Sequence, residues 1–127
     1  MSELREPIII FRPSAPGLQK FMGKLEASVM EIVWENGPLT VKRALFFISH
    51  KHHYAYTTIM TVMSKLTQKG MLSREKSGHS FVYSAEMGKE QFLTFAVEKV
   101  ISGLQSDFGA IVSSFLAAPS RSRKKGK

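Results

Sequence analysis

The chain has no cysteine among its 127 residues. That absence excludes a disulfide-stapled scaffold and any thiolate metal or catalytic site. Glycine is also sparse, with 9 residues, which excludes a collagen-like chain. Acidic residues are the third shortage, since 10 Asp and Glu stand against 18 Lys and Arg, giving a net charge of +8. Basic chains of this kind often bind nucleic acid or anionic membranes.

Long hydrophobic runs are missing as well. A membrane-spanning helix needs about 20 mostly apolar residues. The most apolar window, residues 108–118, is shorter than that and contains Ser113 and Ser114. The apolar run at residues 8–11 is too short for a signal peptide and follows Glu3 and Glu6. We therefore expect no membrane partner and a cytoplasmic location.

The excess charge is concentrated in two places. Residues 36–84 contain seven basic residues against one acid, a sum of +6. Residues 119–127 contain five basic residues and no acid, while residues 89–118 sum to −1 with two Lys against three acids. A basic centre, a near-neutral apolar region and a basic tail follow from this count. With 43% hydrophobic residues, the chain has the composition of one globular domain with a small appendage.

Apolar periodicity predicts three helices, a β-hairpin and two further helices. Residues 1–18, with three prolines, form an extended N-terminal arm in this interpretation. The expected elements are helices at 23–35, 41–49 and 56–69, strands at 71–76 and 80–85, and helices at 89–102 and 105–117. Thr40 is the expected N-cap of the second helix. Gly103 is expected to end the fourth helix, and residues 119–127 are expected to be a disordered basic tail.

The third predicted helix has an unusual polar face. Its apolar stripe is Ile59, Val62, Met63 and Leu66, and the opposite face carries Thr, Ser, Gln and Lys side chains without one acid. Short hydroxyl side chains allow close approach to a DNA major groove, and Thr, Ser, Gln and Lys can all bond base edges or phosphates. Because this helix follows another helix and precedes a basic hairpin, the order indicates a winged helix-turn-helix. A merely polar helix face is the alternative.

The polar face and its surroundings give a predicted set of DNA-contacting residues. Base edges are assigned to Thr57, Thr58, Thr61 and Ser64. Backbone contacts are assigned to Lys42, Arg43, Tyr54, Tyr56, Lys65, Gln68, Lys76 and His79. Phosphate contacts position a protein on the duplex, and base contacts select the sequence.

Several sequence motifs point to a known family. They are LEASVMEIVW at 25–34 with GPLTV at 37–41, AYTTIMTVM at 55–63, Leu66 through KGML at 69–72, and REK at 74–76 with FVYS at 81–84. In this order they resemble the penicillinase-repressor family (BlaI/MecI/CopY type) over residues 23–115. The resemblance implies a winged-helix transcriptional repressor that binds a palindromic operator as a homodimer through its C-terminal helices.

The resemblance also implies two kinds of inducer. In the penicillinase branch a membrane sensor protease cuts the repressor, and in the copper branch a Cys-rich C-terminus senses metal. This chain has no Cys, and Asn36 is its only Asn, so no Asn–Phe cleavage bond is present. A sensor protease or another inducer system remains a candidate partner.

The residues also predict self-association. On the expected fourth helix the apolar arc covers about two thirds of the circumference, whereas a helix on one core needs an arc of about 100°. The surplus apolar surface is most simply buried by a second copy. The predicted dimerisation residues are Phe92, Phe95, Ala96, Val100, Leu104, Phe108, Ile111, Val112 and Phe115. A compact monomer that folds these helices back over the wing domain is the alternative.

Other chemistry has little support. His50, His52 and His53 share one loop, but no nearby carboxylate or Cys completes a metal site, so we interpret the loop as a solvated basic segment. No phosphate-binding glycine loop and no catalytic triad spacing occurs, and Glu26, Glu31 and Glu35 are interpreted as the solvated face of the first helix. We expect neither an enzyme nor a cofactor. The domain organisation is then an arm (1–18), a winged helix (19–86), a dimerisation region (87–118) and a tail (119–127). A winged-helix protein–protein or RNA-binding module is the alternative function.

Overall fold

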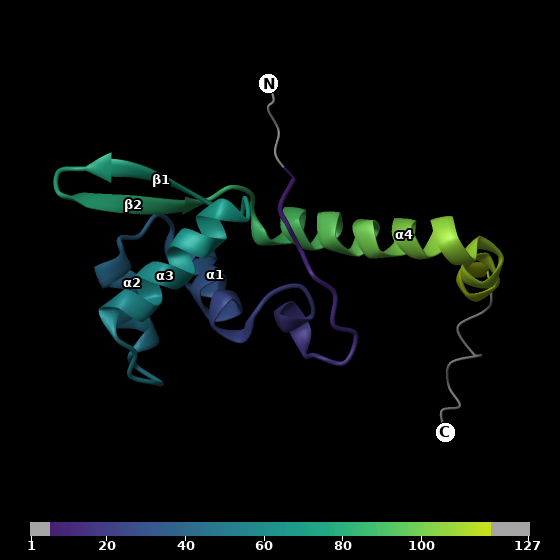
Figure 1. Ribbon diagram of the computed structural model, residues 1–127, viewed down its shortest axis with the longest axis horizontal. Helices are drawn as coiled ribbons and strands as arrows, with labels where there is room; N and C mark the ends of the chain where they lie inside the picture. Colours follow the sequence, from purple (N-terminus) through teal and green to yellow (C-terminus); the bar gives the residue numbers. More distant parts are fainter. Residues whose placement is uncertain (1–5, 118–127) are drawn as a thin grey trace. The chain divides into compact units, whose positions relative to one another are not determined.

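The computed structural model describes residues 6–117, which divide into two units within Met1–Phe92 and Leu93–Lys127. The first unit contains α1 (Lys24–Asn36), α2 (Val41–Ile48) and α3 (Tyr56–Gln68). These three helices contact one another pairwise (Figure 1). Their shared core holds side chains that are at most 1% exposed: Val29, Met30, Val33, Ala44, Ile59, Met63 and Leu66.

Local sequence sets the ends of these helices. α1 ends at Gly37, whose φ of 81° is easy only for glycine, and Pro38 follows. α2 begins at Thr40, whose side-chain oxygen accepts a hydrogen bond from the backbone N–H of Arg43 at 3.2 Å. That bond confirms Thr40 as the predicted N-cap.

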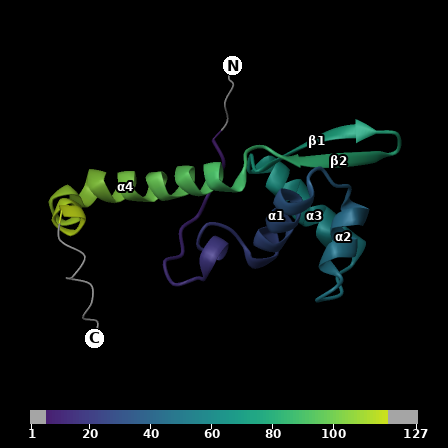
Figure 2. The ribbon, with the colours of Figure 1, turned by 180° about the vertical axis from the view of Figure 1, so that it is seen from behind.

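The wing is the antiparallel pair β1 (Leu72–Ser77) and β2 (Ser80–Ala85), with Arg74 opposite Tyr83. Gly78, with φ of 63°, lies in the tight turn between the strands. Leu39 and Tyr83 exchange two backbone hydrogen bonds of 2.8 and 2.9 Å, so the wing is joined to the start of α2. Figure 2 shows this hairpin and α1–α3 from behind. The order of three helices followed by a β-hairpin confirms the winged-helix fold class.

The N-terminal segment, which was predicted as an extended arm, contacts the rest of the first unit. Residues 17–20 form a short 3-10 turn, η1 (Gly17–Lys20), and the chain before it folds back. The backbone N–H of Arg12 donates to the carbonyl of Lys20 at 2.8 Å, and Phe11 stacks on the buried Phe21. Residues 6–12 contain no helix or strand, but proline content carries no information on which part of the chain such a segment contacts.

The interpretation of Glu26 as a solvated residue is wrong. Its side chain is buried and bonds the ammonium group of Lys69 at 2.8 and 3.0 Å. Burial by itself raises the pKa of Glu26, but the hydrogen bonds from Lys69 and from the N–H of Gly23, with the charges of Lys69 and Lys65, lower that pKa below its ordinary value. The ion pair therefore joins the start of α1 to the end of α3.

The C-terminal helix is longer than expected. α4 (Lys89–Ala117) is helical through Gly103, where a helix end was predicted, and the break lies instead at Phe108 with φ −134° and ψ 41°. Gly103 does not adopt a positive φ, and a glycine inside a helix costs only about 1 kcal/mol, which neighbouring helix-forming residues can offset. The predicted tail, residues 119–127, lies outside the described residues.

The length of α4 also corrects the prediction that no segment is long and apolar enough to span a membrane. Because α4 is not divided at Gly103, it is the one helix within residues 6–117 that is long and apolar enough to cross a membrane. Length and composition alone do not separate a membrane span from an apolar helix that packs on another protein chain.

Candidate nucleic-acid interface

The outward face of α3 is open to solvent. Thr57, Thr58, Thr61, Lys65 and Gln68 are all exposed, and Ser64 is half-buried. The opposite face of the same helix is fixed in the core by Ile59, Met63 and Leu66, none of which is exposed. The polar face is thus held on a rigid element, as a base-reading surface requires.

A hollow of about 250 Å³ brings three separate segments together beside this face. It lies between the start of α2, one side of α3 and the wing. Four of the predicted DNA-contacting residues line it: Lys42, Tyr56, Ser64 and His79. Residues 42 and 79 are far apart in sequence, and the Leu39–Tyr83 pairing brings their segments into proximity. The hollow therefore brings together four of the twelve predicted residues, from α2, α3 and the wing.

Two residues on this surface were not predicted. The guanidinium of Arg74 lies 4.4 Å from the ring centroid of Phe81 and donates to the Tyr83 hydroxyl at 3.4 Å. Met60 is 40% exposed and lines the hollow. Strand alternation offers a signal for Arg74, because it places this residue across from Tyr83. A cation stacked on an aromatic ring is held in place at a small entropic cost when it meets a phosphate.

The other eight predicted residues do not line the hollow. Five of them are on the exposed face of α3, and the remaining three lie on other segments. Arg43 is exposed on α2, with its guanidinium 5.3 and 5.1 Å from the ring centroids of Phe46 and Phe47. Lys76 is exposed near the tip of the wing. Tyr54 packs against His52 at 6.1 Å between ring centroids, within a different cavity. Their assignments to DNA stay predictions.

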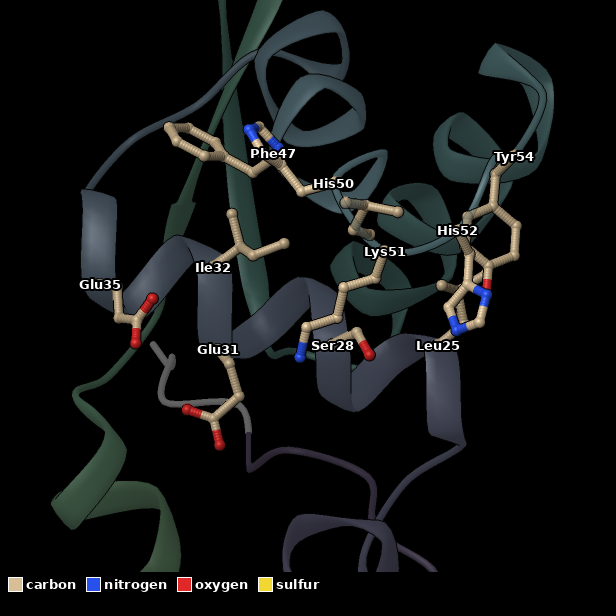
Figure 3. A pocket seen from close by; sticks show the side chains of 11 residues that line it. Leu25, Ser28, Glu31, Ile32, Glu35, Phe47, His50, Lys51, His52 and Tyr54 are labelled. Atoms are coloured by element: carbon tan, nitrogen blue, oxygen red, sulfur yellow. The ribbon is translucent and has the colours of Figure 1, made fainter.

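That second cavity, of about 380 Å³, lies between α1 and the loop that follows α2 (Figure 3). Glu31 and Glu35 line it from α1, and His50, Lys51 and His52 line it from the loop. Glu31 is already paired with Lys89 at 2.9 Å. Within residues 6–117, no three His, Asp or Glu side chains are grouped closely enough to hold a metal ion.

The predicted dimerisation residues fall into three classes of exposure. Phe92 and Ala96 are buried, and Phe92 packs against Phe21 and Trp34 at about 6 Å between ring centroids. Phe95, Val100 and Val112 are half-buried. The exposed members are Leu104, Phe108, Ile111 and Phe115, which are 43–65% exposed. The second half of α4 therefore exposes a run of large apolar side chains.

Comparison with known proteins gives consistent relatives. A family model described as Penicillinase repressor matches residues 22–125. The transcriptional regulator BlaI of Mycobacterium tuberculosis is 29% identical over 73 residues, 57% of this chain and 53% of that protein. A penicillinase repressor of Bacillus licheniformis is 25% identical over 68 residues, 54% of this chain and 53% of that protein. The chain spans about half the length of these curated relatives.

A solved structure resembles the winged helix. The solution structure of the DNA-binding domain of the repressor BlaI aligns with a TM-score of 0.50 at 25% identity, over 54% of this chain and 83% of that chain. The family match extends over most of the sequence, from Met22, two residues before α1 begins, to beyond the end of α4. With the ordered motifs, the winged helix and this match in agreement, the chain belongs to the penicillinase repressor family.

Proposed function

We propose that this protein is a sequence-specific DNA-binding transcriptional repressor that acts in the cytoplasm as a homodimer on a palindromic operator. The observation that carries the proposal is the exposed, acid-free face of α3, flanked by cations from α2 and the wing. An ordinary solvated helix carries acids, and acids here would repel phosphates. The names of its relatives, which include repressors, support the same function.

The contacts divide by depth in the groove. Thr57, Thr58, Thr61 and Ser64 are short enough for α3 to enter a major groove and bond base edges. Longer or peripheral groups surround them and are assigned to the sugar–phosphate backbone: Lys42, Arg43, Tyr54, Tyr56, Lys65, Gln68, Lys76 and His79. Repression is then steric, because a bound protein occupies the promoter.

The homodimer rests on the apolar surface of α4. Phe108 is 55% exposed, and Ile111, Phe115 and Leu116 are each more than 60% exposed. A monomer rarely leaves such a patch in water, and a second copy covers it with an identical patch. Two copies related by a two-fold axis present two α3 helices to half-sites about one DNA turn, or a small multiple, apart.

Selection of bound sequences from random duplex DNA with the full chain tests DNA recognition. Recovery of a palindrome is the expected result. If selection enriches no sequence and random duplex binds as well as any recovered site, the repressor proposal fails and a protein–protein or RNA-binding module takes its place.

Light scattering of full-length variants tests the dimer. Ile111→Glu places a charge in the exposed apolar stripe and is expected to give monomers, because a charge buried without a partner is strongly unfavourable. Ser113→Glu, on the polar side of the same helix, is the matched control. Monomeric wild-type protein would contradict the proposal, and its partition into lipid vesicles would favour a membrane partner for α4.

We also propose a partner that releases the protein from DNA. Within these 127 residues the absence of Cys excludes thiolate copper sensing, and the single Asn36 is followed by Gly37 rather than Phe. The partner is accordingly a sensor protease that cuts a different bond or another inducer system. A survey of the neighbouring genes identifies which, and a neighbouring membrane protease would support the first.

A further inference from the structure

The N-terminal segment lies outside the family match yet is firmly bound to the winged helix. The match begins at residue 22, and residues 6–12 precede it. Within this segment the N–H groups of Ile8, Ile10 and Arg12 all donate to backbone carbonyls, at 2.8, 3.4 and 2.8 Å. The Arg12 guanidinium adds hydrogen bonds to the carbonyls of Gln19 and Met22 at 3.3 and 3.2 Å. We call residues 6–12 the N-terminal strap.

The strap reaches the end of α3. That helix ends with Gly70 at φ 84°, and the N–H groups of Gly70 and Met71 return to the carbonyls of Thr67 and Leu66 at 3.1 and 2.9 Å. The carbonyl of Lys69 accepts a hydrogen bond from the Ile8 N–H at 2.8 Å. The strap thereby supplies the partner that this carbonyl would otherwise take from water.

Packing reinforces the hydrogen bond. Pro7 is buried, and a methyl group added at Gly70 would lie 3.4 Å from the Cα of Pro7. On its other side, the Lys69 ammonium bonds the buried carboxylate of Glu26. Lys69, the C-cap residue of α3, is therefore held both by α1 and by the strap.

The contact uses the backbone of Ile8 rather than its side chain. That side chain is 62% exposed, so it adds little to the core. The N–H of Ile9, in contrast, donates to no group within the described residues. Alternate N–H groups thus face the winged helix, and Ile8 provides the one hydrogen bond from the strap to the cap of α3.

We propose that the N-terminal strap is a positioning element for base reading, which fixes the orientation of α3 through the Ile8–Lys69 hydrogen bond. The inference rests on the proposed DNA-binding function. Base contacts require a helix held within about 0.5 Å and 10–20° of its productive geometry. Phosphate contacts from flexible Lys and Arg side chains tolerate more movement. Loosening the strap therefore lowers sequence preference without lowering affinity for random DNA.

The test compares Ile8→Pro with Ile9→Pro in the full chain, on the selected operator and on random duplex. Ile8→Pro removes the N–H that bonds Lys69, and Ile9→Pro removes one that has no acceptor among residues 6–117. We expect Ile8→Pro to lower the ratio of operator to random-duplex affinity about two- to tenfold, the effect of one hydrogen bond. Ile9→Pro is expected to change that ratio less than about twofold, a difference below the size of one hydrogen bond.

A second pair of variants covers the case in which Ile8→Pro does not fold. Pro7→Gly loosens the strap but keeps the Ile8 N–H, and Pro13→Gly makes the same change at an exposed position outside the strap. Pro7→Gly is expected to lower the affinity ratio and Pro13→Gly to leave it unchanged. A structural role alone would reduce affinity for both DNAs in proportion. That proportional loss, or an unchanged ratio in Ile8→Pro and Pro7→Gly, overturns the proposal.

Hydrogen exchange separates this inference from the proposed function. If the wild-type chain itself prefers no DNA sequence, the proposed function fails. The role of the strap is then tested by the hydrogen-exchange rates of the Gly70 and Met71 amides. Faster exchange of these amides in Ile8→Pro, but not in Ile9→Pro, supports a strap that holds α3. Equal exchange in both variants overturns it.

Discussion

Salt dependence gives the sharpest measure of the proposed DNA surface. Lys65 is exposed on α3 and forms no salt bridge within the described residues, so its charge is available to a phosphate. Each neutralised phosphate contributes about 0.9 to the slope of log K against log salt. The proposed set has four Lys or Arg contacts in each protomer, Lys42, Arg43, Lys65 and Lys76, which predicts a slope of about −7 for a dimer.

Lys65→Ala removes one phosphate contact from each protomer, so the slope is expected to become about −5.4. Between 50 and 200 mM salt, affinity then falls about 10³-fold in the variant instead of about 10⁴-fold in the wild type. Fluorescence anisotropy on the selected operator, measured over that range, provides both slopes. The variant is expected to weaken binding to random duplex as well, since a phosphate contact is blind to sequence.

The control is Lys24→Ala, which removes the same charge from an exposed residue of α1 outside the proposed contact set. It is expected to leave the slope nearly unchanged. An unchanged slope in Lys65→Ala, or an equal change in Lys24→Ala, would refute the assignment of Lys65 to a phosphate and leave only a general effect of net charge.

Three further predictions follow from the structure. Thr61→Ala is expected to cost about 1–3 kcal/mol on the operator and little on random duplex, and equal losses on both would contradict base reading. Glu26→Gln is expected to cost about 1–3 kcal/mol of unfolding free energy at pH 7 in urea titrations. Because the folded-state pKa of Glu26 is lowered, the carboxylate stabilises the fold above about pH 4.3, and this stabilisation disappears as pH falls through the folded pKa. The difference in unfolding free energy between the wild type and Glu26→Gln is therefore expected to narrow in acid. The exposed Glu35→Gln is the control and is expected to show no such narrowing. Gly103→Ala is expected to stabilise α4 by about 0.5–1 kcal/mol in thermal unfolding, because alanine loses less conformational entropy than glycine inside a helix. A destabilisation of about 1–2 kcal/mol would instead indicate a left-handed conformation at residue 103.

The local parts of the fold were readable from the sequence. Helix periodicity identified the buried stripe Ile59, Met63 and Leu66, and the turn residues Gly37, Gly70 and Gly78 marked the ends of helices and strands. These signals lie within one or two turns of the residues that they control. They are enough to place the acid-free face of α3 on the solvent side.

Long-range pairing was not readable. Glu26 and Lys69 are separated by 43 positions, and neither spacing nor composition indicates that they meet. The strap was missed for the same reason, because an extended segment has no periodicity that identifies its partner. Arg74 was counted as part of the basic centre, but its stacking on Phe81 depends on the wing register.

Gly103 is the opposite case. A local signal was present, but the surrounding helix-forming residues override it. The same override moves the break between the two predicted helices from Gly103 to Phe108.

The break at Phe108 has a consequence for how two copies would separate. A straight helix turns its apolar stripe by about 20° per heptad relative to a straight partner, so contact is lost after a few turns. A non-helical residue resets that phase, and residues 109–117 begin a new stripe. In the proposed dimer, each subunit then contacts the other through two short helical segments instead of one long helix. Such a dimer dissociates in two steps, through an intermediate in which the contact of one helical segment is lost while the other segment still keeps the subunits together.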